Sequence, residues 1–290
     1  MKIIVTGSLG HIGKPLTQEL VAKGHEVTVI SSNPEKKAEI EALGAKPAIG
    51  KLDDVAFLTS TFTGADALFA MEPPNYASTD LVAYYEQTGN NYAEAVKKTG
   101  LKRVVHLSSY GAHLSEGTGM IVGSHRVENI LNALDGVSVT HLRPGYFYYN
   151  LDSLKPMIKN AGIMGANYGG EDRLPLVAPS DIGAAAAEEL TKTSGPKVRY
   201  IVSDERTCNE VAAVIGRAIG KPGLQWLTFS DEQYADGLSK AGLPPHFAAM
   251  LTELGASVHS GKLREDYDKH KPPFSKVKLE DYVKEYAKDF

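Results

Sequence analysis

Short apolar runs alternate along most of the chain with longer segments in which apolar residues recur at helical spacing. The runs are rich in β-branched side chains, which is typical of buried parallel strands. They predict strands over residues 2–6, 26–30, 45–49, 66–71, 103–107, 137–142 and 198–202. Helices are predicted over 14–23, 35–43, 79–99, 122–134 and 182–191, and a short one begins at Asp53 or Asp54. This alternation predicts an α/β fold with a doubly wound parallel sheet and right-handed crossovers.

The pattern changes in the second half of the chain. The glycine-rich segment 162–170 predicts a loop, and Pro179-Ser180-Asp181 predicts a cap before the helix that starts at Ile182. After Thr207 the pattern is mostly helical, with helices predicted over 210–219, 231–240, 245–254 and 279–288. We therefore predict a nucleotide-binding domain over 1–150 and a smaller, mainly helical substrate lobe over 151–290. Within that lobe, residues 180–202 should rejoin the main sheet.

A glycine turn stands between the first predicted strand and the first predicted helix. Its spacing is Gly-x-x-Gly-x-x-Gly, from Gly7 to Gly13. Such a turn lets backbone N–H groups approach a pyrophosphate, and the helix dipole adds partial positive charge. The context predicts a Rossmann-type dinucleotide site. Its residues are Gly7, Ser8, Leu9, Gly10, His11, Ile12 and Gly13.

Composition narrows the class of protein. The 290 residues are 42% hydrophobic and carry a formal charge of -4, which disfavours direct nucleic-acid binding because phosphate neutralisation supplies most of that affinity. Cys208 is the single cysteine, so an internal disulfide is excluded, and the nine histidines show no metal-ligand spacing. No apolar run approaches the roughly 18 residues of a membrane span. We expect a cytoplasmic protein without a metal, a signal peptide or a membrane segment.

Several further motifs, taken in order, resemble the NmrA-like family of atypical short-chain dehydrogenases/reductases. Besides the glycine turn they are Met71-Glu72-Pro73-Pro74-Asn75, Asn91, Leu107-Ser108-Ser109, Leu142-Arg143-Pro144-Gly145-Tyr146-Phe147, Pro179-Ser180-Asp181-Ile182-Gly183, Glu210-Val211-Ala212 and Gly242-Leu243-Pro244. This family includes quinone and triphenylmethane reductases, plant aromatic ether reductases and redox-sensing regulators. The resemblance implies NAD(P) binding. It adds these residues to the cofactor site: Met71, Glu72, Pro73, Ser108, Ser109, Pro144 and Tyr146.

The end of the second predicted strand bears on the choice of cofactor. A carboxylate there would bind both ribose hydroxyls and repel a 2′-phosphate, but this chain has Ser31, Ser32 and Asn33. Lys36 and Lys37 follow one turn later, where they either meet the phosphate or form a solvated helix face. We predict NADP as the cofactor, with NAD as the alternative.

The adenine side of the predicted site departs from the family pattern. The family usually has Gly-Asp after the third strand, whereas here Lys51 stands in place of the acid. We expect the backbone N–H of Leu52 to reach the adenine and Asp53 to cap the following helix.

The catalytic pair of ordinary short-chain dehydrogenases is missing. Met120 and Ser124 occupy the positions of its tyrosine and lysine. A positioned acid contributes about 10²–10⁴ in rate, so its absence disfavours reduction of simple ketones more than that of quinones or cationic dyes. Tyr110 and His125 are the candidate catalytic substitutes, although Tyr110 could equally form a pocket wall and His125 a surface histidine.

Aromatic residues follow the Pro144-Gly145 turn at the end of a predicted strand. Alternate rings there can line a flat apolar pocket, or pack as core. The predicted substrate contacts are Pro74, Tyr76, Tyr110, Phe147 and Asn150. His106 and His141 lie within predicted strands, where we expect buried, hydrogen-bonded side chains.

Together these features predict an NAD(P)H-dependent oxidoreductase that transfers hydride to a planar, electron-poor acceptor such as a quinone. The main alternative is a non-catalytic NADP(H)-binding redox sensor that acts through a protein partner. A sugar-nucleotide epimerase shares the fold, but that chemistry needs the missing tyrosine–lysine pair. The predicted partner is a small aromatic or quinone-like molecule.

Overall fold

A computed structural model describes residues 1–290. The chain divides into two compact units that exchange segments along the sequence. Unit 1 comprises residues 1–112, 123–143 and 182–199, and unit 2 comprises residues 113–122, 144–181 and 200–290. None of the helices is both long enough and apolar enough to span a membrane.

A seven-stranded sheet with the order β10-β6-β5-β4-β1-β2-β3 forms the centre of unit 1. Its strands are β1 (Lys2–Val5), β2 (Glu26–Ser31), β3 (Lys46–Ile49), β4 (Ala67–Ala70), β5 (Arg103–Leu107), β6 (Ser138–Pro144) and β10 (Val198–Ile201). Strands β1 to β6 pair in parallel, and β1 pairs on one side with β2 and on the other with β4. The strand order therefore reverses direction between β1 and β4, the place where open α/β sheets bind ligands at their carboxyl ends.

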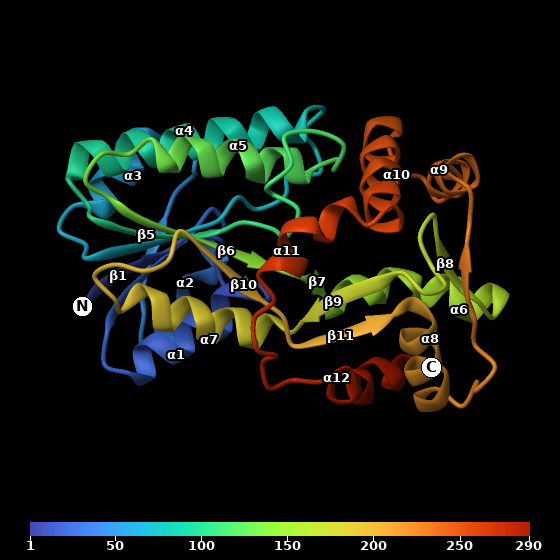
Figure 1. The fold of residues 1–290 in the computed structure, drawn as a ribbon. Helices are drawn as coiled ribbons and strands as arrows, with labels where there is room; N and C mark the ends of the chain where they lie inside the picture. The colour runs from blue at the N-terminus through green and yellow to red at the C-terminus, as the bar shows by residue number, and fades with distance from the viewer. The chain divides into compact units, whose positions relative to one another are not determined.

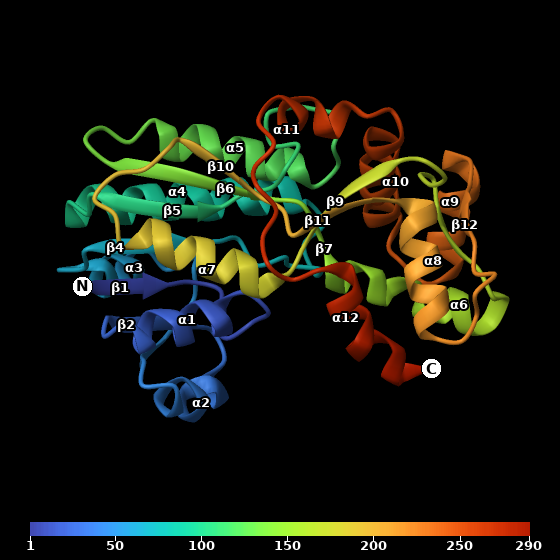
Figure 2. The same cartoon turned by 60° about the horizontal axis from the view of Figure 1, so that its bottom comes forward.

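Helices cover both faces of this sheet, as Figure 1 shows with α4 and α5 above it and α1 and α7 below. They are α1 (Gly13–Ala22), α2 (Lys37–Ala42), α3 (Val55–Phe62), α4 (Leu81–Thr99), α5 (Ile121–Asn132) and α7 (Pro179–Leu190). Figure 2 shows α1 and α7 side by side, and a Cβ on Gly183 would lie 3.0 Å from the backbone nitrogen of Leu16. The predicted doubly wound α/β fold is confirmed.

Local side chains define several helix starts. Asn33 accepts a hydrogen bond from the backbone of Glu35, as expected for a cap, and Asp80 caps α4 in the same way. Asp54, and not Asp53, accepts from Phe57 and caps α3, so the expected cap at Asp53 was wrong. Helix α7 begins at Pro179, three residues before the predicted start, because proline suits the first helical position.

The main core of unit 1 lies between the sheet and helices α3 to α5. Leu68, Val104 and Val139 of the strands pack in one buried cluster with Tyr92 and Leu131 of the helices. A Cβ on Gly89 of α4 would lie 3.0 Å from Val127 of α5, so this glycine permits the close approach of the two helices. The strands are buried on both faces, which explains why they could be recognised in the sequence as short continuous apolar runs.

Unit 2 contains two small sheets besides its helices. The strands β7 (Tyr146–Phe147), β9 (Arg173–Val177) and β11 (Asp204–Thr207) form a sheet with the order β11-β9-β7, and β8 (Met164–Ala166) pairs with β12 (Trp226–Thr228). The helices are α6 (Lys155–Ala161), α8 (Cys208–Ala218), α9 (Asp231–Lys240), α10 (Pro245–His259), α11 (Glu265–Lys269) and α12 (Leu279–Tyr286). The loop predicted over 162–170 was wrong at β8, because β8 forms by pairing with β12, a strand far along the chain.

A buried ion pair joins α7 to β5 in unit 1. Arg103 and Glu189 are 2% and 1% exposed, and Nη2 of the arginine lies 3.2 Å from Oε2 of the glutamate. The guanidinium also donates to the Glu189 carbonyl and, at 2.9 Å, to Oγ1 of Thr140. Arg199 and Lys192 reach the other carboxylate oxygen at 2.7 and 2.9 Å. Nearly all the polar atoms of the pair are thus satisfied, which a buried pair requires.

Glu189→Gln should lower the free energy of unfolding by about 3–5 kcal/mol, because Arg103 would stay buried beside a neutral partner. Denaturant unfolding followed by circular dichroism measures the change. Glu188→Gln is the matched control, since that side chain is 52% exposed and surface pairs contribute about 0–1 kcal/mol. Equal losses in the two variants would contradict the role of this pair as an anchor.

Candidate functional site

The turn after β1 adopts a backbone conformation that depends on glycine at two positions. Gly7 has a φ of +85° and Ser8 a φ of +58°, so the chain passes through the left-handed region. A Cβ on Gly7 would lie 2.1 Å from Sδ of Met71, and a Cβ on Gly13 would lie 2.1 Å from the Ser8 carbonyl oxygen. Side chains at either position would displace the turn.

Gly10 differs from these two glycines because the protein itself leaves room for a side chain there. A Cβ would meet only the Gly7 carbonyl oxygen, at 3.6 Å, and Gly10 is exposed. The start of α1 nearby has no side-chain cap and no acidic residue in its first turn. The Lys14 N–H donates to the Gly10 carbonyl and Pro15 has no N–H, so what the start of α1 offers an anion such as a pyrophosphate is chiefly its positive dipole end. The residues present fit the predicted dinucleotide.

The end of β2 is hydrogen-bonded to the glycine turn. The Ser8 hydroxyl donates to Oγ of Ser31 at 3.0 Å, and the Ser8 backbone N–H donates to the Ile30 carbonyl, so the turn is fastened to β2. Ser31 is buried, whereas Ser32 is exposed. Lys36 follows the end of β2, and its Nζ lies 2.7 Å from Oε2 of Glu39.

Oε1 of Glu39 also lies 3.1 Å from Nζ of a second lysine, Lys14. These lysines lower the pKa of Glu39 through hydrogen bonds from Lys36 first and Lys14 second. Lys37 is exposed one position further on. A 2′-phosphate in this region would therefore meet lysines that already share a carboxylate.

The segment after β3 is held by α4. Asn91 donates from Nδ2 to the Leu52 carbonyl at 2.9 Å, and Gln87 donates to Oδ1 of Asn91 at 2.9 Å. Both amides are on one face of α4, four residues apart. The contact orients the Leu52 backbone, whose predicted N–H contact to adenine remains a prediction.

The segment after β4 lies directly over the glycine turn. Met71 reaches Gly7, as the close approach to its sulfur shows, and the Met71 carbonyl accepts from the Tyr92 hydroxyl at 2.6 Å. The Thr6 hydroxyl lies 3.4 Å from the same carbonyl. The side chain of Glu72 turns inward to His106, at 3.0 Å between Oε2 and Nε2. Exposed Tyr76 lies further along the same loop, after the predicted contacts Pro73 and Pro74.

A buried polar triad stands at the ends of β5 and β6. The Ser108 hydroxyl donates to Oε1 of Glu128 at 2.6 Å, and Arg143 donates to both carboxylate oxygens, at 2.9 and 2.6 Å. Burial alone would raise the pKa of Glu128, but the hydrogen bonds from Arg143 and Ser108 hold it below its ordinary value. The sequence analysis did not predict this contact; Arg143, directly after the predicted strand over 137–142, was the available signal.

The two predicted catalytic residues have different surroundings. Tyr110 is 6% exposed and follows Ser109, whose hydroxyl donates to the Tyr110 carbonyl. His125 has both ring nitrogens engaged, with Nδ1 2.9 Å from the Ala112 carbonyl and Nε2 3.0 Å from Nδ2 of Asn129. Both ring nitrogens thus already have a partner within the protein, and neither is left for a substrate.

The remaining predicted residues belong to unit 2. Tyr146 and Phe147 form β7, and the Tyr146 hydroxyl lies 3.4 Å from that of Tyr168. Burial raises the pKa of Tyr146, so its phenol stays protonated. Phe147 stacks on Tyr149 with 5.1 Å between ring centroids, and the Asn150 carbonyl accepts from Ser153. The roles of Phe147 and Asn150 toward substrate, and of Pro144 and Tyr146 toward cofactor, remain predictions.

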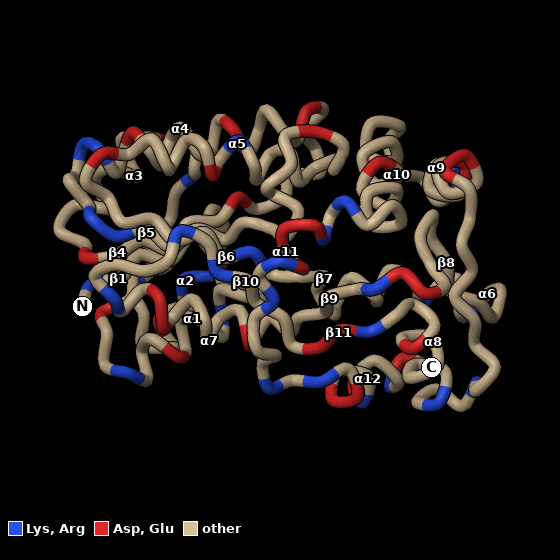
Figure 3. Tube along the Cα trace, viewed as in Figure 1, with Lys and Arg blue, Asp and Glu red and all other residues tan.

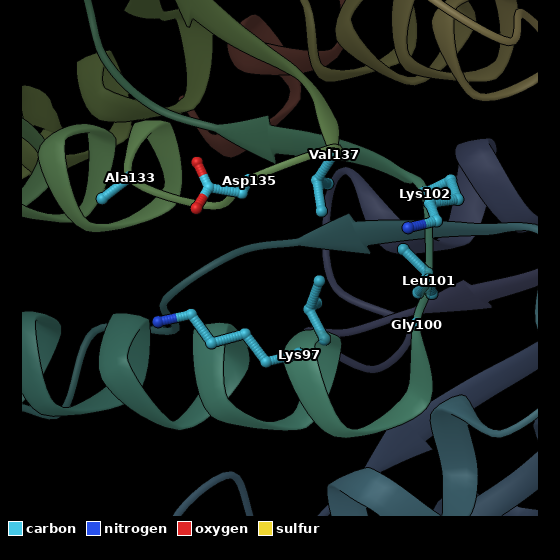
Figure 4. Close-up of a pocket in the computed structure, with 8 residues that line it drawn as sticks. Lys97, Gly100, Leu101, Lys102, Ala133, Asp135 and Val137 are labelled. Carbon is cyan, nitrogen blue, oxygen red and sulfur yellow. The ribbon is translucent and has the colours of Figure 1, made fainter.

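A shallow cavity of about 290 Å³ in unit 1 lies away from all these residues. Figure 4 shows it between the end of α4, at Lys97, and the segments at Lys102 and Asp135. Those two segments immediately precede β5 and β6, so the cavity is at the amino ends of the strands. The glycine turn, Glu72 and Ser108 are at the opposite, carboxyl ends, where α/β sheets bind ligands.

The strand order, the glycine turn and the open start of α1 define an α/β protein of the Rossmann type. The chain belongs to the NmrA-like family, whose model matches residues 1–254. The resemblance seen in the sequence motifs is thereby confirmed.

Two relatives of the chain are named as reductases. The chain is 26% identical over 257 residues to an NAD(P)H azoreductase of Xenophilus azovorans, covering 88% of this chain and 86% of that protein. It is 28% identical over 223 residues to a (4-alkanoyl-5-oxo-2,5-dihydrofuran-3-yl)methyl phosphate reductase of Streptomyces griseus, covering 76% and 74%.

Solved structures share the fold over the full length. An NADPH-dependent quinone oxidoreductase from Escherichia coli, complexed with NADPH, has a TM-score of 0.84 at 22% identity and covers 98% of this chain and 99% of its own. A triphenylmethane reductase from Citrobacter sp. has a TM-score of 0.82 at 22% identity, with coverage of 99% and 100%.

Proposed function

We propose that the protein is an NADPH-dependent reductase that transfers hydride to a planar, electron-poor acceptor such as a quinone. The observation that carries the proposal is the turn at Gly10, which the fold leaves open above an uncapped start of α1. Relatives that reduce azo compounds, and fold neighbours named for quinones and triphenylmethane dyes, support the reaction class.

The residues of unit 1 divide the binding of the cofactor between them. The backbone from Gly7 to Gly13 would hold the pyrophosphate, and the end of β2 would meet the ribose and its 2′-phosphate. Met71, over the turn, and Ser108, at the end of β5, would border the nicotinamide. The bound cofactor would supply the hydride, and these residues would orient it.

The distribution of charge supports a small substrate. Lys and Arg are interspersed with Asp and Glu along the trace, as Figure 3 shows, and the formal charge of the chain is -4. A polyanion would need a basic face. The missing tyrosine–lysine pair favours acceptors that take hydride readily, which quinones and cationic dyes do.

Gly10→Val should abolish dinucleotide binding and leave the fold intact, because a Cβ there meets no protein atom closer than the Gly7 carbonyl oxygen, at 3.6 Å, while the added bulk keeps a pyrophosphate from the backbone of the turn. Calorimetric titration with NADPH measures binding, and thermal unfolding tests the fold. Gly223→Val is the control, since no atom lies within 4 Å of a Cβ built there. Unchanged NADPH affinity in folded Gly10→Val would refute the proposed pyrophosphate site.

NADPH should bind about tenfold more tightly than NADH, since hydrogen bonds to a charged group contribute about 1.5–3 kcal/mol and exposed lysines contribute less. Lys37→Ala should reduce the NADPH affinity severalfold and leave NADH affinity nearly constant. Parallel titrations of both nucleotides provide the measurement, with exposed Lys98→Ala as the control. Tighter binding of NADH would reverse the assignment.

Benzoquinone-type acceptors should be reduced measurably faster than any aliphatic ketone. Tyr110→Phe and His125→Ala should each slow this reaction by less than the range of about 10²–10⁴ of a positioned acid, because neither side chain is needed for hydride transfer. NADPH oxidation followed across an acceptor panel tests both statements. Efficient ketone reduction that is lost in Tyr110→Phe would mean that the acid had been relocated. Tight NADPH binding with no oxidation would favour the sensor and direct the search to a protein partner.

A further inference from the structure

Glu39 of α2 lies between two lysines that come from different segments of unit 1. Its Oε1 lies 3.1 Å from Nζ of Lys14, near the start of α1, and its Oε2 lies 2.7 Å from Nζ of Lys36. Lys36 ends the short 3₁₀ helix Pro34–Lys36, which follows β2. One carboxylate therefore connects α1 to the segment after β2, and Figure 2 shows α1 and α2 as neighbours.

Both lysines adjoin parts of the proposed cofactor site. Lys14 directly follows Gly13, the last glycine of the turn, and Lys36 comes shortly after the end of β2. The hydrogen bond from Ser8 to Ser31 joins the turn to that strand end. A dinucleotide whose pyrophosphate lies on the turn has its adenosine ribose at the end of the second strand. NAD-binding folds have a carboxylate there, whereas a cation accommodates the 2′-phosphate of NADP.

The geometry around Glu39 is one that a phosphate group can also adopt. Lys14 and Lys36 donate to separate oxygens of the carboxylate, as they could to separate oxygens of a phosphate. Lysine binds phosphate as a point charge on a flexible stem, so its ammonium group can move from one anion to another. The three side chains are between 36% and 48% exposed. A ligand can therefore reach both ammonium groups without any element unfolding.

Carboxylate and phosphate compete for the same two lysines. Hydrogen bonds from Lys36 first and Lys14 second lower the pKa of Glu39, so its side chain is charged near neutral pH. A phosphate monoester carries about 1.5 to 2 negative charges at pH 7. It attracts the lysines more strongly than a carboxylate does, and its like charge repels Glu39. A 2′-phosphate would therefore displace Glu39, and it would bind more weakly than it would to free lysines.

We propose that Glu39 is a specificity-determining residue that limits the preference of this protein for NADPH over NADH. Its carboxylate holds Lys14 and Lys36 in the free protein, and the 2′-phosphate has to take both lysines from it. NADH has a hydroxyl at that position and leaves the bridge of Lys14, Glu39 and Lys36 intact. The inference rests on the proposed NADPH-dependent function and explains why its discrimination between the two nucleotides is modest.

Glu39→Gln removes the competing charge and keeps the size of the side chain. Each exposed ion pair contributes up to about fivefold in an equilibrium constant, and two such pairs are lost. NADPH should therefore bind about three- to tenfold more tightly to Glu39→Gln, while the NADH affinity stays within about twofold. Calorimetric titration of the full-length protein with each nucleotide measures the change. Weaker NADPH binding would mean that Glu39 orients the lysines for the phosphate, and it would overturn the inference.

Glu35→Gln is the matched control for charge. Glu35 is exposed in the same segment and forms no ion pair, so its replacement removes one negative charge without releasing a lysine. Its NADPH affinity should stay within about twofold of that of the unchanged protein, because exposed charges without a direct partner are screened by salt. Equal gains in Glu35→Gln and Glu39→Gln would reveal a general effect of net charge and overturn the inference.

Lys14→Gln tests the bridge from the side of α1. It should weaken NADPH binding by about two- to fivefold and leave the NADH affinity nearly constant. Lys23→Gln on the same helix is the control, because Lys23 pairs with Glu19 and not with Glu39. In a Lys14→Gln background the gain from Glu39→Gln should be at least halved, since one of the two lysines that it releases is missing. An undiminished gain would place Lys14 outside the phosphate site and overturn the inference.

Fragments of the cofactor separate the failure of this inference from the failure of the proposed function. Adenosine 2′,5′-bisphosphate carries the 2′-phosphate, whereas adenosine 5′-monophosphate lacks it. Glu39→Gln should tighten binding of the bisphosphate alone, and equal changes for both fragments would overturn the inference. Binding of neither NADPH nor NADH to the unchanged protein would instead reject the cofactor site itself. Binding of both nucleotides with a ratio that Glu39→Gln leaves unchanged would reject only the role of Glu39.

Discussion

The site in unit 1 depends on one constraint: Gly7 and Gly13, in the turn after β1, must have no side chain. At Gly7 the space is taken by Met71, which follows β4, and at Gly13 it is taken by the Ser8 carbonyl. Ser8 is in turn tied to β2 through Ser31 and Ile30. The turn therefore holds together the carboxyl ends of three adjacent strands. Because those ends flank the reversal of strand order, the same contacts that shape the turn also place Glu72 next to it.

Unit 1 contains three separate groups of buried polar side chains. The Glu128–Arg143–Ser108 triad and the Glu72–His106–His141 chain both lie on the face beneath α4 and α5, and the Arg103–Glu189 pair is buried as well. Buried polar groups are costly when they are only partly satisfied. In the triad each carboxylate oxygen has a partner, whereas Oε1 of Glu72 has none.

Membership of the NmrA-like family explains the fold and leaves the acid of the reaction open. Met120 and Ser124 stand where ordinary short-chain dehydrogenases have their catalytic tyrosine and lysine. Both ring nitrogens of His125 already contact neighbouring groups. The Glu72–His106 contact lies deeper in unit 1, where the carboxylate is buried beneath α4.

Local patterns in the sequence determined the doubly wound sheet, the glycine turn, the Asn33 cap and the buried positions of His106 and His141. These depend on alternation, on glycine spacing and on short-range caps, which a single stretch of chain contains. Tertiary structure alone decided that Asp54 caps α3, that β8 forms against β12, and that Arg143 binds Glu128. It also decided that Glu72 faces His106 and that His106 faces His141 across β5 and β6. Such partners come from separate strands and helices, so their distances and hydrogen-bond directions exist only once the sheet has set the register between them.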